Sequence, residues 1–248
     1  VVAVLFASRT GSTALTRLAE RNFRIRQAGE TLNVPILQAR ARRHDPDEAP
    51  RDTLCRVIAR NSEAGWFMVK TGVPGLLNGA RLGFFEEYGP LIRPVLLLRR
   101  DGLGQALSIF AAKHTRRYHS TQEIQQPMTE ADYDRAEIRQ YLTDITSSNA
   151  LIIRLLPYFP YPPRVLFYED FADGDEGAAI RVLAETGLPP RPEPIENPRR
   201  EVHRITHPLT ARFRDRFLAD AGWHDRRLLA RHDRMIAEWQ ERREAGTA

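Results

Sequence analysis

Residues 1–20, VVAVLFASRTGSTALTRLAE, predict how this chain folds. The uninterrupted apolar run 1–7 is typical of a strand buried inside a parallel sheet. It leads into the polar turn 8–13, and a helical pattern begins at Ser12 and continues to about Arg26. A helix that starts directly after such a strand points several backbone N–H groups and its positive dipole end at one place. The turn is therefore suited to a bound phosphate or sulfate.

The alternation of strands and helices continues along the chain. Further strands are expected at 65–70, 94–100 and 164–170, and helices at 102–118, about 130–156, about 175–186, 207–220 and 225–243. Residues 38–53 are expected to form a polar loop, and the Pro-rich stretch 189–198 a connection. We therefore expect an α/β fold with a P-loop-type parallel sheet flanked by helices on both faces. One domain is expected over 1–248, with a helical C-terminal part from about 199.

The composition is that of a globular protein. Of the 248 residues, 42% are hydrophobic and 28% are charged. No apolar run approaches the ~18 residues of a membrane-spanning helix, and no signal peptide is visible. The single cysteine, Cys55, excludes an internal disulfide and suits a reducing compartment, so a cytoplasmic protein is expected. Because Cys55 stands in a short helical pattern, a packed thiol is favoured over a nucleophile.

The net charge of +5 leaves two kinds of partner to consider, a nucleic acid or a small polyanion. Basic residues are interleaved with acidic ones along the chain rather than massed in one block. There is no zinc-finger cysteine pattern and no aromatic-rich RNA-binding motif. We therefore expect no nucleic-acid partner.

The turn 8–13 departs from an ATP-binding loop. That loop follows the pattern G-x-x-x-x-G-K-[ST], whereas here Phe6 replaces the first Gly and Ser12 replaces the Lys after Gly11. Arg9 supplies a positive charge with a forked set of donors, and the hydroxyls add further donors. From this turn alone, an ordinary helix cap by Thr10 or Ser12 is as good an interpretation as an anion site.

A second segment, 94–108, favours the anion site. Arg99 ends a strongly apolar strand, where it would face the crevice in which parallel sheets bind ligands. Ser108 follows about two turns into the next helix. The alternative is an ion pair of Arg99 with Asp101 or Asp170, with Ser108 as a small packing residue. Together with the turn 8–13, the segment points to two neighbouring anion sites.

Three stretches resemble those of PAPS-dependent sulfotransferases, where PAPS is 3'-phosphoadenosine 5'-phosphosulfate. They are SRTGST (8–13), RRDGLGQALSIF (99–110) and LFYEDF (166–171). The order QALS (105–108) with AAKHTRRY (111–118) and GETLN (29–33) resembles the bacterial trehalose sulfotransferase type and its carbohydrate-sulfating relatives. The resemblance implies transfer of a sulfuryl group from PAPS to a hydroxyl, with release of PAP and no metal. It also implies a small acceptor such as a sugar, and allows a homodimer.

The resemblance assigns roles to individual residues. The 5'-phosphosulfate would be held by Ser8, Arg9, Thr10, Gly11, Ser12 and Thr13, with Arg9 stabilising the phosphate that leaves. Arg99 and Ser108 would hold the 3'-phosphate. Glu30 is the expected base for the acceptor hydroxyl, and Gly29 fits a helix stop that turns it toward the crevice. Lys70 and His114 are candidate contacts to the sulfate or acceptor.

Several assignments stay open at this point. His114 and His119 are rival bases, and Arg199 and Arg200 either close over the cofactor or form a solvated turn. Tyr118 stands where the family often has Trp, and FMVKTGVPG around Lys70 matches the family only at the Lys. The competing functions are a P-loop ATP-dependent kinase-like enzyme and a non-catalytic PAP- or phosphate-binding protein.

Overall fold

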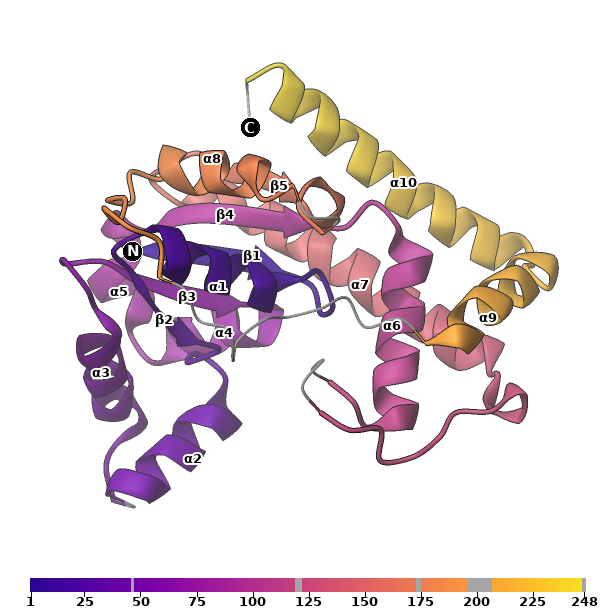
Figure 1. Ribbon diagram of the computed structural model, residues 1–248, viewed down its shortest axis with the longest axis horizontal. Coiled ribbons are helices and arrows are strands. Elements are labelled where there is room, and N and C mark those ends of the chain that lie inside the picture. The colour runs from indigo at the N-terminus through magenta and orange to yellow at the C-terminus, as the bar shows by residue number, and fades with distance from the viewer. Residues whose placement is uncertain (46, 119–121, 173–174, 196–206, 247–248) are drawn as a thin grey trace.

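A parallel five-stranded sheet forms the centre of the molecule (Figure 1). The computed structural model describes residues 1–45, 47–118, 122–172, 175–195 and 207–246. In spatial order the strands are β2 (Arg26–Gly29), β3 (Phe67–Thr71), β1 (Val2–Phe6), β4 (Arg93–Leu98) and β5 (Arg164–Phe167). Val4 of β1 lies beside Lys70 on one side and Val95 on the other. The opening strand is therefore the middle strand of the sheet.

Helices cover both faces of this sheet, as the sequence predicts. The alternate side chains of Val2, Val4 and Phe6 pack against α1 (Ser12–Asn22) and α8 (Gly177–Glu185). Ala3 and Leu5 point to the opposite face. That face is covered by α3 (Pro50–Asn61), α4 (Val73–Arg81), α5 (Phe84–Tyr88), α7 (Arg135–Leu155) and α10 (Trp223–Glu244).

A third apolar cluster lies beyond the carboxyl edge of the sheet. It joins α6 (Gly102–Thr115), α7 and α9 (Pro208–Ala219) through side chains such as Leu107, Phe110, Leu142 and Phe213. Helix α10 then crosses back and packs against α7 and α6 (Figure 1). The C-terminal helices are thereby attached to the edge at which the parallel strands end. None of the helices in the described part of the chain is long and apolar enough to span a membrane.

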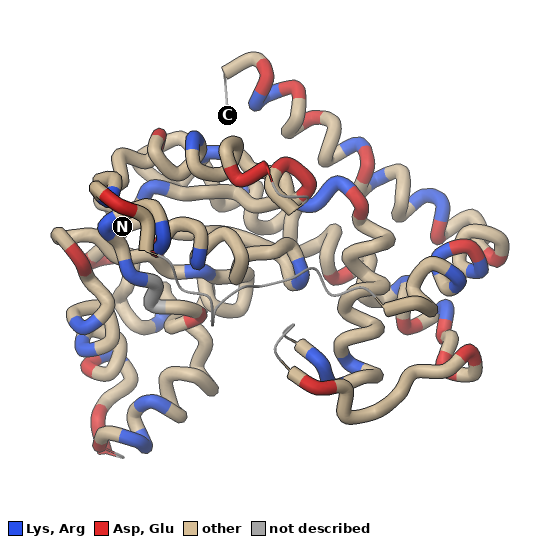
Figure 2. The backbone as a smooth tube through the Cα atoms, viewed as in Figure 1, with Lys and Arg blue, Asp and Glu red and all other residues tan. Residues whose placement is uncertain are grey.

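The expected loop at 38–53 is wrong. Most of this stretch belongs to α2 (Val34–His44) and α3, with a short connection between them. Leu37 and Ala41 are one turn apart and buried, whereas Arg42 and Arg43 are exposed. Figure 2 marks the basic and acidic positions along the backbone of these helices. Pro35 and Pro50 stand in the first turns of the two helices, where proline is tolerated.

Two predicted boundaries also move. Helix α1 ends at Asn22 because Phe23 turns extended and bridges to Pro190, and the edge strand β2, which the sequence analysis missed, follows. The strand expected to run to 170 ends at Phe167, and Tyr168–Asp170 form a single 3-10 turn, η4. The described part of the Pro-rich stretch is therefore bound to the end of α1 rather than being a loose connection.

The packing of α1 on the sheet predicts a large effect of truncating Leu15, which is fully buried. Leu15→Ala should lower the free energy of unfolding by about 2–5 kcal/mol, measured by urea denaturation. Leu77→Ala is the matched control, since Leu77 is 55% exposed on α4, and should change it by less than about 0.5 kcal/mol. Equal effects of the two substitutions would contradict this account of the core.

Candidate functional site

The loop after β1 is shaped by two left-handed residues. Arg9 and Gly11 have φ of 67° and 77°, and Gly11 is the N-cap of α1 without any side-chain cap. The hydroxyl of the buried Thr10 donates to the carbonyl oxygen of Ala7 at 3.0 Å, away from the helix start. The alternative that Thr10 or Ser12 caps the helix is therefore wrong. The first N–H groups of a helix have no partner within the helix, and the first residues of α1 line the cavity beside this loop.

Tyr168 closes on this loop from the end of β5. A Cβ atom on Gly11 would lie 2.6 Å from Cδ2 of Tyr168, so the ring occupies the space that any larger residue would need. The guanidinium of Arg99 lies over the other part of the same ring, 4.8 Å from its centroid. Tyr168 thus contacts both segments that were predicted to bind anions. The sequence analysis noted Tyr168 but missed this contact; its place directly after a strand was the available signal.

The two predicted anion segments meet. Nε of Arg9 donates to Oγ of Ser108 at 3.1 Å, and Nη1 of Arg99 donates to the carbonyl oxygen of Arg9 at 3.4 Å. Nη1 of Arg9 also donates to the carbonyl oxygen of Tyr118 at 2.6 Å. Of the carboxylates considered as alternative partners of Arg99, Asp170 pairs with Arg100 and Arg243. Asp101 pairs with Arg214, and the charge of Arg99 also lowers the pKa of Asp101.

The meeting point is strongly positive. Burial lowers the pKa of the Arg9 guanidinium, and the charge of Arg99 lowers it further. Within the described residues no ion pair joins Arg9 to a carboxylate. Two partly dehydrated cations held side by side repel each other unless an anion lies between or beside them. The arrangement is therefore suited to an anionic ligand.

Lys70 connects the loop with Glu30. Its Nζ donates to Oγ1 of Thr13 at 2.7 Å and lies 3.5 Å from Oε1 of Glu30. Burial lowers the pKa of Lys70, and the neighbouring Glu30 carboxylate raises it. The expectation that Gly29 ends the first helix is wrong, because β2 intervenes and Gly29 ends that strand with φ of 70°. The chain nevertheless delivers Glu30 to the same crevice.

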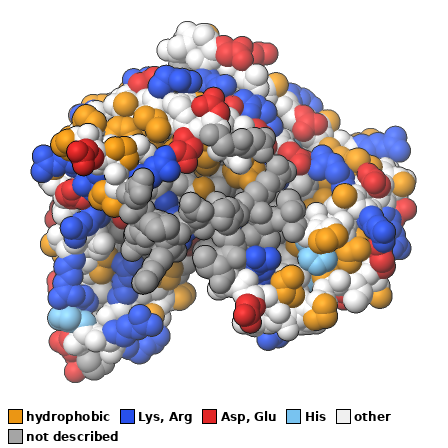
Figure 3. Space-filling view, in the orientation of Figure 1, with side chains coloured by type: hydrophobic (Ala, Val, Ile, Leu, Met, Phe, Trp, Pro, Cys, Tyr) orange, Lys and Arg blue, Asp and Glu red, His pale blue; other side chains and the backbone are white. Residues whose placement is uncertain are grey.

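These groups line one cavity of about 1060 Å³. Its walls include nine of the predicted site residues: Ser8, Arg9, Gly11, Ser12, Thr13, Glu30, Lys70, Arg99 and Ser108. Thr10 is buried beneath the loop, and its side chain does not reach the wall. Figure 3 shows that basic and acidic side chains are interleaved on the face that it presents.

His114 is not brought to the described wall of the cavity. Its Nε2 lies 3.0 Å from Oε2 of Glu137 on α7, and its ring stacks on Phe110 with centroids 4.1 Å apart. The predicted substrate contact therefore has no geometric support. His119, Arg199 and Arg200 lie outside the residues that the structure describes.

The sequence analysis also missed the side of the cavity that α9 forms. Helix α9 and the residue before it contribute His207, Pro208, Thr210, Ala211 and Arg214. Arg214 forms a bidentate ion pair with Asp101, with both N–O distances at 2.9 Å. In the described part of the chain, no group of three or more His, Cys, Asp or Glu side chains is arranged to hold a metal ion.

Comparisons with known proteins give a likeness in structure only. No family model matches the sequence, and no curated protein matches it. The crystal structure of a sulfotransferase from Alicyclobacillus acidocaldarius is similar, with a TM-score of 0.57, 16% identity and coverage of 95% of each chain. This chain shares the fold of that sulfotransferase.

The contact between Tyr168 and the loop gives a prediction for Gly11→Ala. Gly65 has the same φ of 77° but no atom within 4 Å of an added Cβ, so Gly65→Ala is the matched control. The control should lower the free energy of unfolding by about 1–2 kcal/mol, the cost of a left-handed alanine. Gly11→Ala should cost more, because Tyr168 must also move. Equal losses in urea denaturation would show that Tyr168 does not constrain the loop.

Proposed function

We propose that this protein transfers a sulfuryl group from PAPS to a hydroxyl of a carbohydrate or glycolipid-like acceptor and releases PAP. The observation that carries the proposal is the hydrogen bond of 3.1 Å between Arg9 and Ser108. It joins the segment expected to bind a phosphosulfate to the segment expected to bind a separate phosphate. PAPS carries these two groups on one molecule. The shared fold with a known sulfotransferase supports the same conclusion.

The donor is held by its two charged ends. The N–H groups of residues 8–13 and the hydroxyls of Ser8, Ser12 and Thr13 bind the 5'-phosphosulfate at the start of α1. Arg99 and Ser108 bind the 3'-phosphate, which distinguishes PAPS from ATP. Arg9 now donates to a hydroxyl and to a carbonyl oxygen, and a phosphate oxygen is a stronger acceptor than either. The guanidinium of Arg9 therefore exchanges these acceptors for the leaving phosphate while it stays at the wall of the cavity.

The transfer itself needs a base and positive charge. The acceptor oxygen attacks sulfur while the Glu30 carboxylate takes its proton. The bond between sulfur and the bridging oxygen breaks, and its electrons leave with the 5'-phosphate of PAP, where Arg9 offsets the developing charge. Lys70 lies next to both Glu30 and Thr13 and so offers its charge to the sulfuryl oxygens during transfer. A carbohydrate acceptor is supported by the resemblance of residues 29–33 and 105–108 to the trehalose type.

Ligand stabilisation tests the donor site. PAP at 100 times its dissociation constant should stabilise the protein by about 2.7 kcal/mol, a rise in Tm of roughly 5–10 °C for a chain of this size. AMP, which lacks the 3'-phosphate, should give a much smaller rise at the same concentration, and so should ATP with Mg²⁺. Equal or greater stabilisation by ATP with Mg²⁺ would contradict the proposal and favour the kinase-like function.

Replacing the proposed base tests whether the protein is catalytic. In Glu30→Gln, turnover of PAPS with a reactive acceptor should fall by about 10²–10⁴-fold, because the amide cannot take the proton. The Kd of PAP should change little. Glu86→Gln, at an exposed position on α5, is the matched control and should keep full activity. Unchanged turnover in Glu30→Gln would refute the base, and a wild type that binds PAP but sulfates no acceptor would favour the non-catalytic function.

A further inference from the structure

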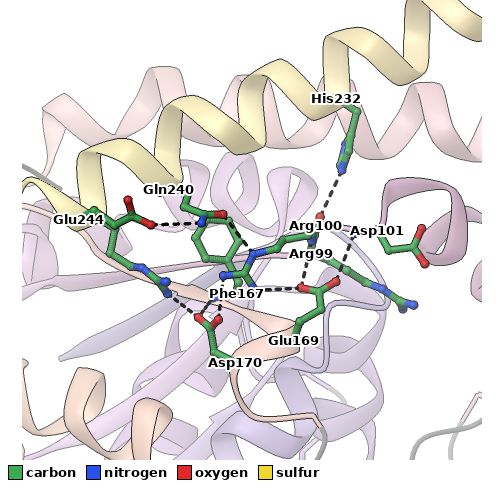
Figure 4. A network of polar contacts seen from close by, with 10 residues as sticks. Arg99, Arg100, Asp101, Phe167, Glu169, Asp170, His232, Gln240 and Glu244 are labelled. Carbon is green, nitrogen blue, oxygen red and sulfur yellow. Dashed lines mark hydrogen bonds and ion pairs between the residues drawn. The ribbon is translucent and has the colours of Figure 1, made fainter.

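Helix α10 reaches the turn that carries Arg99 (Figure 4). His232, near the middle of this helix, is fully buried, and its Nε2 lies 3.2 Å from the carbonyl oxygen of Arg99. Because a carbonyl oxygen only accepts hydrogen bonds, Nε2 must carry the proton and donate. Nδ1 has no hydrogen-bond partner among the described residues. Within that part of the chain, the carbonyl of Arg99 is thus the only polar contact of this ring.

The ring of His232 packs tightly against the backbone at Gly102. A Cβ atom on Gly102, the first residue of α6, would lie 2.6 Å from Cδ2 and from Nε2 of His232. The ring therefore rests directly on the start of the helix that follows Arg99. Gly102 and His232, 130 positions apart, are fitted to each other.

His232 holds one side of a single peptide group. The carbonyl of Arg99 and the N–H of Arg100 belong to the same planar unit. The carbonyl accepts from His232, and the N–H donates to Oε2 of Glu169 at 3.1 Å (Figure 4). With both edges fixed, this plane cannot rotate, and the direction in which the Arg99 side chain leaves the backbone is fixed with it.

Arg99 needs such support because of its surroundings. Its guanidinium is placed over Tyr168 and beside the main chain of Arg9, whose own charge repels it. This repulsion favours a direction of the side chain away from the loop, and a fixed backbone opposes that change. Glu169, which holds the N–H of Arg100, stands in the 3-10 turn after β5, whereas His232 comes from the C-terminal helix α10.

We propose that His232 is a positioning residue that aims Arg99 at the 3'-phosphate and so sets the preference for a 3'-phosphorylated nucleotide. The inference rests on the proposed function, which gives Arg99 this ligand. It assigns to α10 a role in donor selection, although α10 contributes no residue to the described wall of the cavity.

The test compares the Kd of PAP with the Kd of AMP by calorimetry. Wild type should prefer PAP. His232→Met keeps the side-chain volume but removes the hydrogen-bond donor. It should raise the Kd of PAP by ~10-fold and change the Kd of AMP by less than about twofold. His232→Gln, whose amide N–H can still donate, should restore most of the preference. His224→Met, the same substitution at an exposed position of α10, should leave both constants unchanged.

The outcomes separate the inference from the proposed function. A wild type without preference for PAP over AMP would overturn both. If His232→Met keeps the wild-type preference for PAP, the positioning role alone is overturned. The same holds if this variant weakens the binding of PAP and of AMP equally. If His232→Met does not fold, Gly102→Ala carries the test, because its methyl group displaces the ring. The same selective loss of PAP is then expected, and a kept preference overturns the inference.

Discussion

Two partly buried guanidinium groups, those of Arg9 and Arg99, face one cavity, and much of the structure serves to keep them together. They stand one to three residues beyond the ends of β1 and β4, which are neighbours in the sheet, so the strand spacing of about 4.8 Å brings the two charges near each other. That proximity is unfavourable without an anion. The left-handed turn at Arg9, the ring of Tyr168 and the hydroxyl of Ser108 fix the side chains in this state. A site built in this way has prepared its charge before the ligand arrives, which is the condition for electrostatic stabilisation of a transition state.

The central part of the fold could be predicted because its signals are local. A fully buried strand such as β1 or β4 must be apolar throughout, and each is followed at once by a polar turn and a helical period. The edge of the sheet at β2, the lower edge in Figure 1, lacks these signals. Strand β2 is a short edge strand, and α2 buries only Leu37 and Ala41 among many charged residues, so composition alone favoured a loop. Only the packing of these elements against β3 and α3 decides their structure. Such packing between distant segments cannot be predicted from any one stretch of sequence.

In the candidate site, too, some residues could be predicted from the sequence and others could not. Residues that directly follow strands were found, because parallel strands bring their carboxyl ends to one edge. His114 was misplaced, although the helical period contains the reason: six residues, or about 1.7 turns, separate it from Ser108, so the two lie on different faces of α6. Thr115, at about two turns, does line the cavity. The wall supplied by α9 could not be predicted, since Arg214 meets Asp101 across 113 positions of sequence.

This last contact joins the middle of the chain to its C-terminal part. Asp101 caps α6 through the N–H of Gly104 and at the same time binds Arg214, while burial and these donors act in opposite directions on its pKa, with a net lowering. One carboxylate therefore aligns the helix that carries Ser108 and fastens α9 to the cavity. The predicted anion-binding residues come from the first 110 positions, but the geometry in which they lie depends on helices that begin after position 207. Because a ligand of this cavity binds only the assembled form, its binding must stabilise those helices as well. The candidate site therefore keeps its geometry only while Asp101 and the carbonyl of Arg99 have their partners on the C-terminal helices.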